Sequence, residues 1–193
     1  IYKRMKKLIV IGAYPNTPKK EEVLINEINS LKDSGFDFML VSHYPASIEL
    51  QSMVDYYIYD KNQTLTPLDK SPYYWFKTDS FFLRVNNSRH SLPICQNMFN
   101  AFKFAEIKKY DFVYFIENDN LFSKNDVSKL NQLVDTMVVE RKKCIFFKPE
   151  GYRDSGSYVY ETQLFGITPS YFNEILKLPV TENEWYEHLM PLT

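Results

Sequence analysis

Two carboxylates follow an apolar segment directly, in the stretch Asp111-Phe-Val-Tyr-Phe-Ile-Glu-Asn-Asp-Asn120. They are Glu117 and Asp119, with one residue between them and few lysines or arginines beside them in sequence. A near-continuous apolar run bounded by polar residues is typical of a buried strand in a sheet covered on both faces. Open α/β sheets bind their ligands at the carboxyl ends of such strands. Two carboxylates there suit a divalent cation, which predicts a metal-assisted reaction on a phosphorylated substrate.

The pair can contact a ligand at the edge of the sheet only if the strand has ended by Glu117. Asn118, Asp119 and Asn120 are turn-forming residues, which favours such an ending. The same pattern also fits a polar strand-to-helix loop whose acids merely face water. The local pattern alone leaves both interpretations open.

The rest of the chain predicts alternating strands and helices. Such alternation favours right-handed crossovers and an α/β fold, a Rossmann-like single domain with a mainly parallel central sheet and helices on both faces. The stretch 61–92 shows no clear periodicity, which is typical of functional or partly mobile segments. The expected strands are 8–13, 36–42, 56–60, 112–116 and 144–148, with 158–167 extended; the expected helices are 18–35, 48–54, 93–109, 123–142, a short one from Thr168-Pro169 and a last one from Thr181.

Composition limits the function classes. The 193 residues suffice for one domain, and the net charge of −1 gives general nucleic-acid binding no electrostatic support. Cys95 and Cys144 lie in apolar surroundings, so we expect buried free thiols and a reducing compartment. Without an apolar run of membrane-spanning length or a signal-peptide pattern, we expect a soluble cytoplasmic protein. We also expect Met5 to be the natural start, and part of an acceptor site to lie beyond the chain.

The order of these elements resembles a GT-A-type glycosyltransferase, a nucleotide-diphospho-sugar transferase similar to glycosyltransferase family 2-like domains. In those enzymes a helix carrying an Arg-Asn pair precedes a strand ending in Asp-x-Asp. This sequence has Gln96-Asn97 and Glu117-Asn118-Asp119 at those places. The acid-x-Asp variant keeps the oxygen ligands, whereas glutamine in place of arginine removes a possible diphosphate contact. The resemblance covers roughly the first two-thirds of the chain, and the strand order supplies most of its weight.

The resemblance implies Mn²⁺ or Mg²⁺ at Asp119, with Glu117 binding the ion directly or through water. It also implies that the end of the first strand approaches the nucleotide and that Asp60 hydrogen-bonds the base or ribose, although Asp60 also fits an exposed turn. Neither a GxGxxG nor a GxxxxGK[ST] motif is present. The donor-binding residues implied in this way are Gly12, Ala13, Tyr14, Asp60, Asn97, Glu117 and Asn118.

Other loops supply further candidates. His43 follows the second strand and suits a contact with phosphate, ribose or acceptor, or an ordinary loop position. Arg84 and Arg89 lie in the aperiodic stretch, where cations would screen a departing diphosphate, unless that stretch is a loop pinned by its own aromatic residues. The resemblance also calls for a carboxylate base on the acceptor side. The candidates are Glu161, Glu182 and Glu187, while Glu184 is explained as the capping-box residue of a helix starting at Thr181.

These observations predict a metal-dependent glycosyltransferase of the hexosyltransferase type. It would move a sugar from a UDP- or GDP-sugar to a carbohydrate or other hydroxyl acceptor. The main alternative is a catalytically inactive GT-A-like module that only binds nucleotide or sugar. A metal nuclease pairing an acid with an acid-x-Lys strand fits less well, because Phe146 stands where the second acid should precede Lys148 and the chain is not basic.

Overall fold

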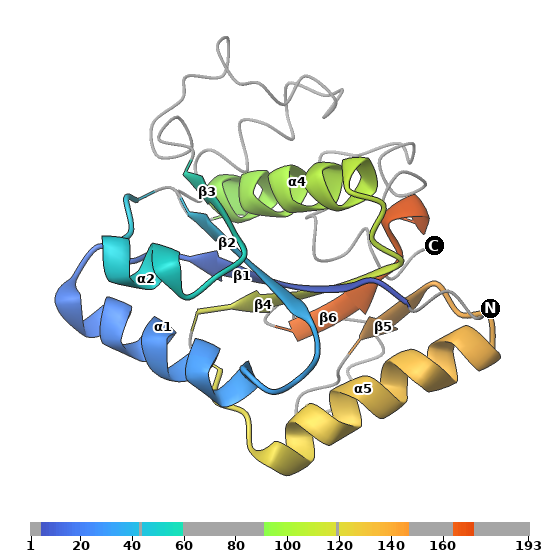
Figure 1. The fold of residues 1–193 in the computed structure, drawn as a ribbon. Coiled ribbons are helices and arrows are strands. Elements are labelled where there is room, and N and C mark those ends of the chain that lie inside the picture. The colour runs from blue at the N-terminus through green and yellow to red at the C-terminus, as the bar shows by residue number, and fades with distance from the viewer. Residues whose placement is uncertain (1–4, 43, 60–90, 119, 147–163, 172–193) are drawn as a thin grey trace, which may run out of the picture.

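The computed structural model describes residues 5–42, 44–59, 91–118, 120–146 and 164–171 (Figure 1). No helix in these ranges is long and apolar enough to cross a membrane. The elements in chain order are β1 (Lys7–Ala13), α1 (Pro18–Leu31), β2 (Asp37–Ser42), α2 (Ile48–Ser52), β3 (Tyr56–Tyr59), α4 (Ser91–Ile107), β4 (Phe112–Glu117), α5 (Lys124–Val139), β5 (Cys144–Phe146) and β6 (Leu164–Ile167).

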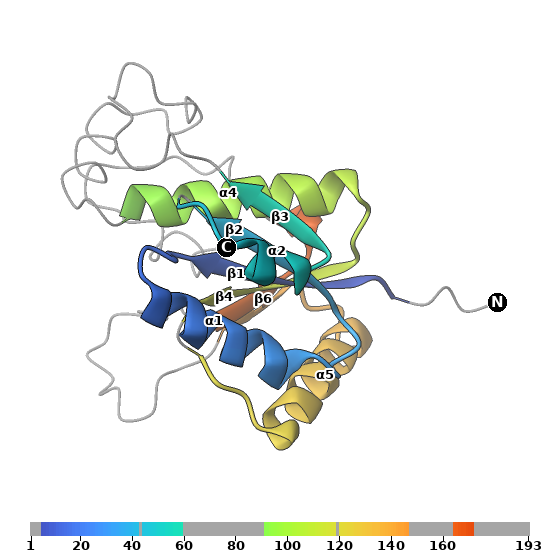
Figure 2. The same ribbon diagram turned by 60° about the vertical axis from the view of Figure 1, so that its left-hand side comes forward.

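The six strands form one mixed sheet in the order β3-β2-β1-β4-β6-β5. The first four strands in chain order are parallel, and β6 runs antiparallel to both of its neighbours. Helix α4 covers one face of the sheet, and α1 and α5 cover the other (Figures 1 and 2). This confirms the predicted α/β class, with a mainly parallel sheet and helices on both faces.

The helix starts follow from their capping residues. The Thr17 side chain accepts a hydrogen bond from the Lys20 amide, and Pro18 occupies the first turn of α1. Ser123 and Asp126 form a reciprocal capping box at the start of α5, as their spacing predicted. Helix α4 begins at Ser91, so the predicted start at Pro93 is wrong by two residues.

Two predicted helix ends are wrong. Helix α1 stops at Leu31, before the predicted end at Gly35, and Gly35 instead takes a positive φ of 74° in the turn leading to β2. Helix α5 stops at Val139 rather than near Lys142, because Arg141 adopts a φ of 55° and the Lys142 amide turns back to the Met137 carbonyl.

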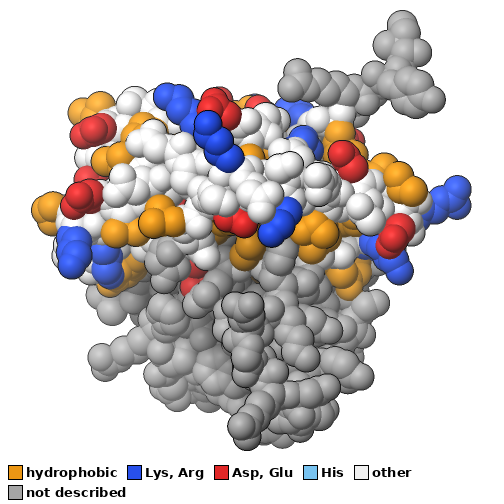
Figure 3. Space-filling view, turned by 90° about the horizontal axis from the view of Figure 1, so that it is seen from below, with side chains coloured by type: hydrophobic (Ala, Val, Ile, Leu, Met, Phe, Trp, Pro, Cys, Tyr) orange, Lys and Arg blue, Asp and Glu red, His pale blue; other side chains and the backbone are white. Residues whose placement is uncertain are grey.

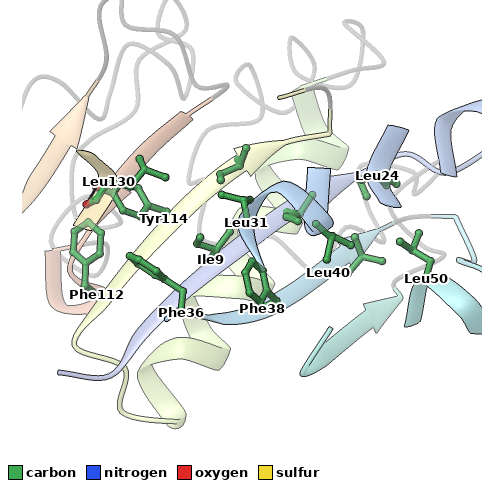
Figure 4. Packing of buried hydrophobic residues seen from close by; sticks show 14 of the residues in the cluster. Ile9, Leu24, Leu31, Phe36, Phe38, Leu40, Leu50, Phe112, Tyr114 and Leu130 are labelled. Atoms are coloured by element: carbon green, nitrogen blue, oxygen red, sulfur yellow. Dashed lines mark hydrogen bonds between the residues drawn. The ribbon is translucent and has the colours of Figure 1, made fainter. Parts of the chain in front are cut away.

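The core lies in two layers, one on each face of the sheet. The layer under α4 is built from residues such as Val10, Phe102 and Phe115. The other layer packs α1, α2 and α5 on the strands, with Ile9 and Tyr114 among its buried residues (Figure 4). Because both faces are covered, the central strands are apolar along most of their length, as the sequence showed.

We predict that Gly166→Ala destabilises the fold. A Cβ atom at position 166 would lie 2.4 Å from Phe112 Cζ and 2.8 Å from Tyr114 Cε1. Both rings are fully buried and pack edge to face with centroids 4.8 Å apart, so they have little room to move. We expect the free energy of unfolding in urea to fall by about 1–3 kcal/mol.

Gly35→Asn is the matched control. Open space surrounds a Cβ atom at position 35, and asparagine tolerates a positive φ, so we expect a change under about 1 kcal/mol. Equal stability of Gly166→Ala and the unmodified chain would show that the two rings can shift at no cost, contrary to this account.

Candidate functional site

The strand order reverses between β1 and β4. Strands β2 and β3 extend the sheet on one side of β1, whereas β4 lies on the other side. The helix that follows β1 and the helix that precedes β4 cover opposite faces of the sheet (Figure 2). Open α/β sheets bind ligands at such a reversal. Gly12 and Glu117 pair across it in register.

Glu117 is the last residue of β4 and Asn118 lies in the turn that follows. The Asn120 side-chain amide donates a hydrogen bond to the Glu117 carbonyl oxygen at 2.8 Å, which closes this turn. Strand β4 thus ends at Glu117, as the predicted turn after it requires. Asp119 lies outside the described residues, so the predicted metal pair stays a prediction. Within the described ranges no three His, Cys, Asp or Glu side chains gather at one place.

Packing favours glycine at position 12, in addition to the role predicted for Gly12 in binding the nucleotide. A Cβ atom on Gly12 would lie 2.6 Å from Phe115 Cζ. Phe115 is buried and stacks on Phe165 with ring centroids 5.6 Å apart, so it cannot retreat easily. The glycine therefore lets a phenylalanine of β4 fill the space beside the end of β1. Its approach to a nucleotide remains a prediction, as does that of Ala13, a buried residue on the opposite face.

Tyr14 and Tyr44 form a pair across the ends of β1 and β2. Their rings meet edge to face with centroids 4.5 Å apart, and the Tyr14 hydroxyl donates to the Tyr44 hydroxyl at 3.2 Å. This hydrogen bond, together with partial burial, raises the pKa of the Tyr14 phenol, so the group stays neutral at physiological pH. The Lys20 ammonium lies 4.4 Å from the centre of the Tyr14 ring and adds a positive charge at this edge.

Asn97 is buried in α4, with 3% of its surface exposed. Its Oδ1 atom has no hydrogen-bond partner in the part of the chain that the structure describes. Because the chain runs from α4 through residues 108–111 into β4, α4 lies antiparallel to the strands. Its amino-terminal half, which contains Asn97, is therefore at the carboxyl edge of the sheet (Figure 1). A buried amide oxygen without a donor costs free energy, which a bound ligand with an N–H or O–H group would recover.

The structure places some of the predicted site residues at the carboxyl edge of the sheet. These are Gly12, Tyr14, Asn97, Glu117 and Asn118, which lie in or next to the elements that meet there. The following predicted residues lie outside the described ranges: His43, Asp60, Arg84, Arg89, Asp119, Glu161, Glu182 and Glu187.

Two residues that sequence reasoning did not assign to the site also lie at this edge. Tyr44 is one, and Ser42, which is fully buried at the end of β2, donates its hydroxyl to the Tyr44 carbonyl. This bond fixes the turn that carries Tyr44 toward Tyr14. Ser42 ends a predicted strand and Tyr44 follows it, and that position was the only signal in the sequence.

Comparison with known proteins identifies the fold. No family model matches the sequence, and no curated protein matches it either. A cytidylyltransferase from Leptospira borgpetersenii is similar in structure over 97% of this chain and 70% of its own, with a TM-score of 0.53 and 14% identity. A putative nucleotide-diphospho-sugar transferase from Desulfovibrio desulfuricans is similar over 97% and 74%, with a TM-score of 0.51 and 10% identity. The chain has a GT-A-like fold.

A third structure, core-mannan synthase A of Aspergillus fumigatus in its Mn/GDP form, has a TM-score of 0.49 at 11% identity and covers 99% of this chain and 70% of its own. That score is too low to support an argument about the site. The GT-A-like fold itself confirms the resemblance seen in the sequence. Identities this low say nothing about the substrate, which has to be argued from the residues at the carboxyl edge.

We predict that Asn97→Leu stabilises the chain in the absence of ligand. Leucine has the same branching as asparagine and leaves no buried acceptor without a donor. We expect the free energy of unfolding to rise by about 1–3 kcal/mol, measured by urea denaturation.

Asn131→Leu is the control with the opposite sign. The Asn131 side-chain amide donates to the Ser34 carbonyl at 3.0 Å, and its oxygen accepts from Lys7 Nζ at 2.5 Å, so its loss should destabilise the chain. If Asn97→Leu destabilised the chain as Asn131→Leu does, Asn97 would be a structural residue and not a ligand contact.

Proposed function

We propose that the chain transfers a sugar from a nucleoside-diphosphate-sugar donor to a hydroxyl acceptor. The observation that carries this proposal is the register pair Gly12–Glu117, at the carboxyl ends of β1 and β4 where the strand order reverses. A carboxylate at that point suits the ion that accompanies a diphosphate, and GT-A-like folds include nucleotide-sugar transferases. The free thiol of Cys144 supports a reducing compartment, for which we propose the cytoplasm.

The oxygen atoms at this edge fit a hard divalent ion. Glu117 is half-buried. Asn118 and Asn120 follow it, and Asp119 stands between these two asparagines in sequence. Carboxylate and carbonyl oxygens are the ligands that Mg²⁺ and Mn²⁺ prefer. We propose that Asp119 holds the ion, with Glu117 as a second ligand directly or through water. A bound ion would supply positive charge to the diphosphate as it leaves.

The chain's own residues would bind and orient the donor. Asn97 Oδ1, which has no partner among the described residues, would accept a hydrogen bond from a hydroxyl or amine group of the nucleotide. Tyr14, fixed by Tyr44, offers an aromatic edge to a base or sugar, and Lys20 adds a cation near phosphate. Asp60, His43, Arg84 and Arg89 remain proposed donor contacts.

The acceptor's proton would go to a carboxylate if the reaction inverts configuration at the sugar. Glu161, Glu182 and Glu187 remain the candidates for this base, because the resemblance to GT-A enzymes calls for one on the acceptor side. Replacing each in turn by glutamine would identify it through a loss of turnover with unchanged donor binding.

Calorimetry with UDP and GDP, each with and without Mn²⁺, tests the donor site. We expect Mn²⁺ to be required for tight binding of one nucleotide, because the diphosphate brings two or more negative charges next to Glu117 and Asp119. Asp119→Ala should weaken that binding by at least roughly ten-fold, the loss of one charge-assisted ligand, and Glu117→Gln by less. Asn97→Leu should weaken binding with and without the metal.

Glu140→Gln is the control, since Glu140 is an exposed carboxylate after the carboxyl-terminal end of α5, away from this edge. Its nucleotide binding should equal that of the unmodified chain. The absence of binding to any nucleotide, with or without the metal, would refute the proposal.

A second reaction is compatible with the same site. The similar cytidylyltransferase has this fold, and nucleotidyl transfer also brings a nucleotide phosphate to a divalent ion. The products distinguish the reactions, because sugar transfer releases a nucleoside diphosphate whereas nucleotidyl transfer from a triphosphate releases pyrophosphate. Nucleotide binding with neither product in any donor mixture would favour the inactive binding module.

A further inference from the structure

The amino-terminal edge of the sheet, opposite the candidate site, collects positive charge. It is formed by residues 5–7, 107–111 and 137–143, which we call the basic edge. These segments contain seven lysines and arginines and two carboxylates, whereas the whole chain has a net charge of −1. The exposed members include Lys108, Lys109, Arg141 and Lys142. In the described structure none of these four side chains forms an ion pair with a carboxylate.

Specific contacts hold the three segments together. The Lys6 amide donates to Asp111 Oδ2 at 2.8 Å, and Lys6 Nζ donates to the Lys108 carbonyl at 3.1 Å. The third segment adjoins them across a groove of about 460 Å³ whose walls include Met5, Asp111, Val138 and Arg141. The carboxyl-terminal ends of α4 and α5 lie on the same side of the molecule in both ribbon views (Figures 1 and 2). The cations therefore form one surface, though they are far apart in sequence.

The basic edge also exposes aliphatic side chains. Ile107 is 74% exposed, Val139 82% and Val138 49%, and Met5 and Met137 line the groove between the cations. Its aromatic side chain, Tyr110, is buried. Exposed aliphatic side chains beside lysines and arginines suit a partner with both apolar and anionic parts.

We propose that the basic edge docks on a membrane surface that contains anionic lipids. Lysine and arginine would contact lipid phosphates while Ile107, Val138 and Val139 enter the boundary between headgroups and acyl chains. A nucleic acid would match the charge but not the aliphatic side chains, and binding to single strands uses exposed aromatic residues that this edge lacks among its described residues. The face over α1 and α5 mixes acidic and basic side chains and offers no such surface (Figure 3).

Docking in this way would direct the candidate site away from the lipid. The strands run from the basic edge to the carboxyl edge, and β1 with its seven residues spans roughly 23 Å. The site would then face the aqueous phase at about that height above the headgroups. This inference is independent of the proposed function, because it rests on residues at the other end of the strands.

Flotation of the full chain with lipid vesicles tests the proposal. We expect little binding to phosphatidylcholine alone and strong binding when phosphatidylglycerol is added, weakened by salt. Each cation near an anionic surface contributes about a factor of five, so Lys108→Gln combined with Lys142→Gln should lower the partition coefficient by roughly twenty-five-fold. Val139→Ser should lower it by roughly ten-fold at unchanged charge.

Lys124→Gln combined with Lys129→Gln is the matched control. It removes the same charge from exposed positions in the first two turns of α5, at the far end of the same helix, and should leave binding unchanged. Circular dichroism would show that all variants fold. The proposal is overturned if the unmodified chain does not bind anionic vesicles, if the control loses as much binding as the Lys108/Lys142 variant, or if Val139→Ser binds like the unmodified chain.

Discussion

The parallel pairing of β1 with β4 is the constraint on which the rest of the structure depends. These two strands are buried on both faces, and each side of the sheet needs its own helical layer to cover them. The chain meets this need by sending α1 to one face and α4 to the other, which forces the strand order to reverse between β1 and β4. The reversal of the strand order at their carboxyl ends is thus a consequence of covering the core.

Packing constrains the residues at the carboxyl ends of β1 and β4. The Phe115 ring occupies the space that a side chain at Gly12 would need. The end of β1 therefore carries no side chain at the position paired with Glu117. The turn after β4 begins at once, since Asn120 closes it on the Glu117 carbonyl. Asn97 differs from them, because its buried oxygen has no hydrogen-bond partner among the described residues. Packing alone does not account for a buried acceptor without a donor, and the proposed nucleotide contact would.

The sequence predicted those elements whose cause is local. Thr17 with Pro18 and Ser123 with Asp126 mark helix starts through contacts within four residues, and apolar runs mark the buried strands. The helix ends were harder, because Gly35 stands in the turn after α1 and Arg141 ends α5 without being a glycine. At the site, the position of Asn97 came from the resemblance to GT-A enzymes and not from periodicity. The Tyr14–Tyr44 contact depends on two strands lying side by side, which no local pattern encodes.

The polarity of the fold explains only part of the charge at its two edges. Every helix that covers a parallel sheet runs opposite to the strands, so helix carboxyl ends gather at the amino-terminal edge, where they favour cations by about 0.3–1 kcal/mol each. Lys108 and Lys109 follow α4, and Arg141 and Lys142 follow α5, in agreement with this rule. The rule does not account for Val139, which is 82% exposed in the last turn of α5 and has nothing to gain from a helix dipole. The aliphatic side chains, more than the lysines, are therefore the part of the basic edge that the proposed amphipathic partner would explain.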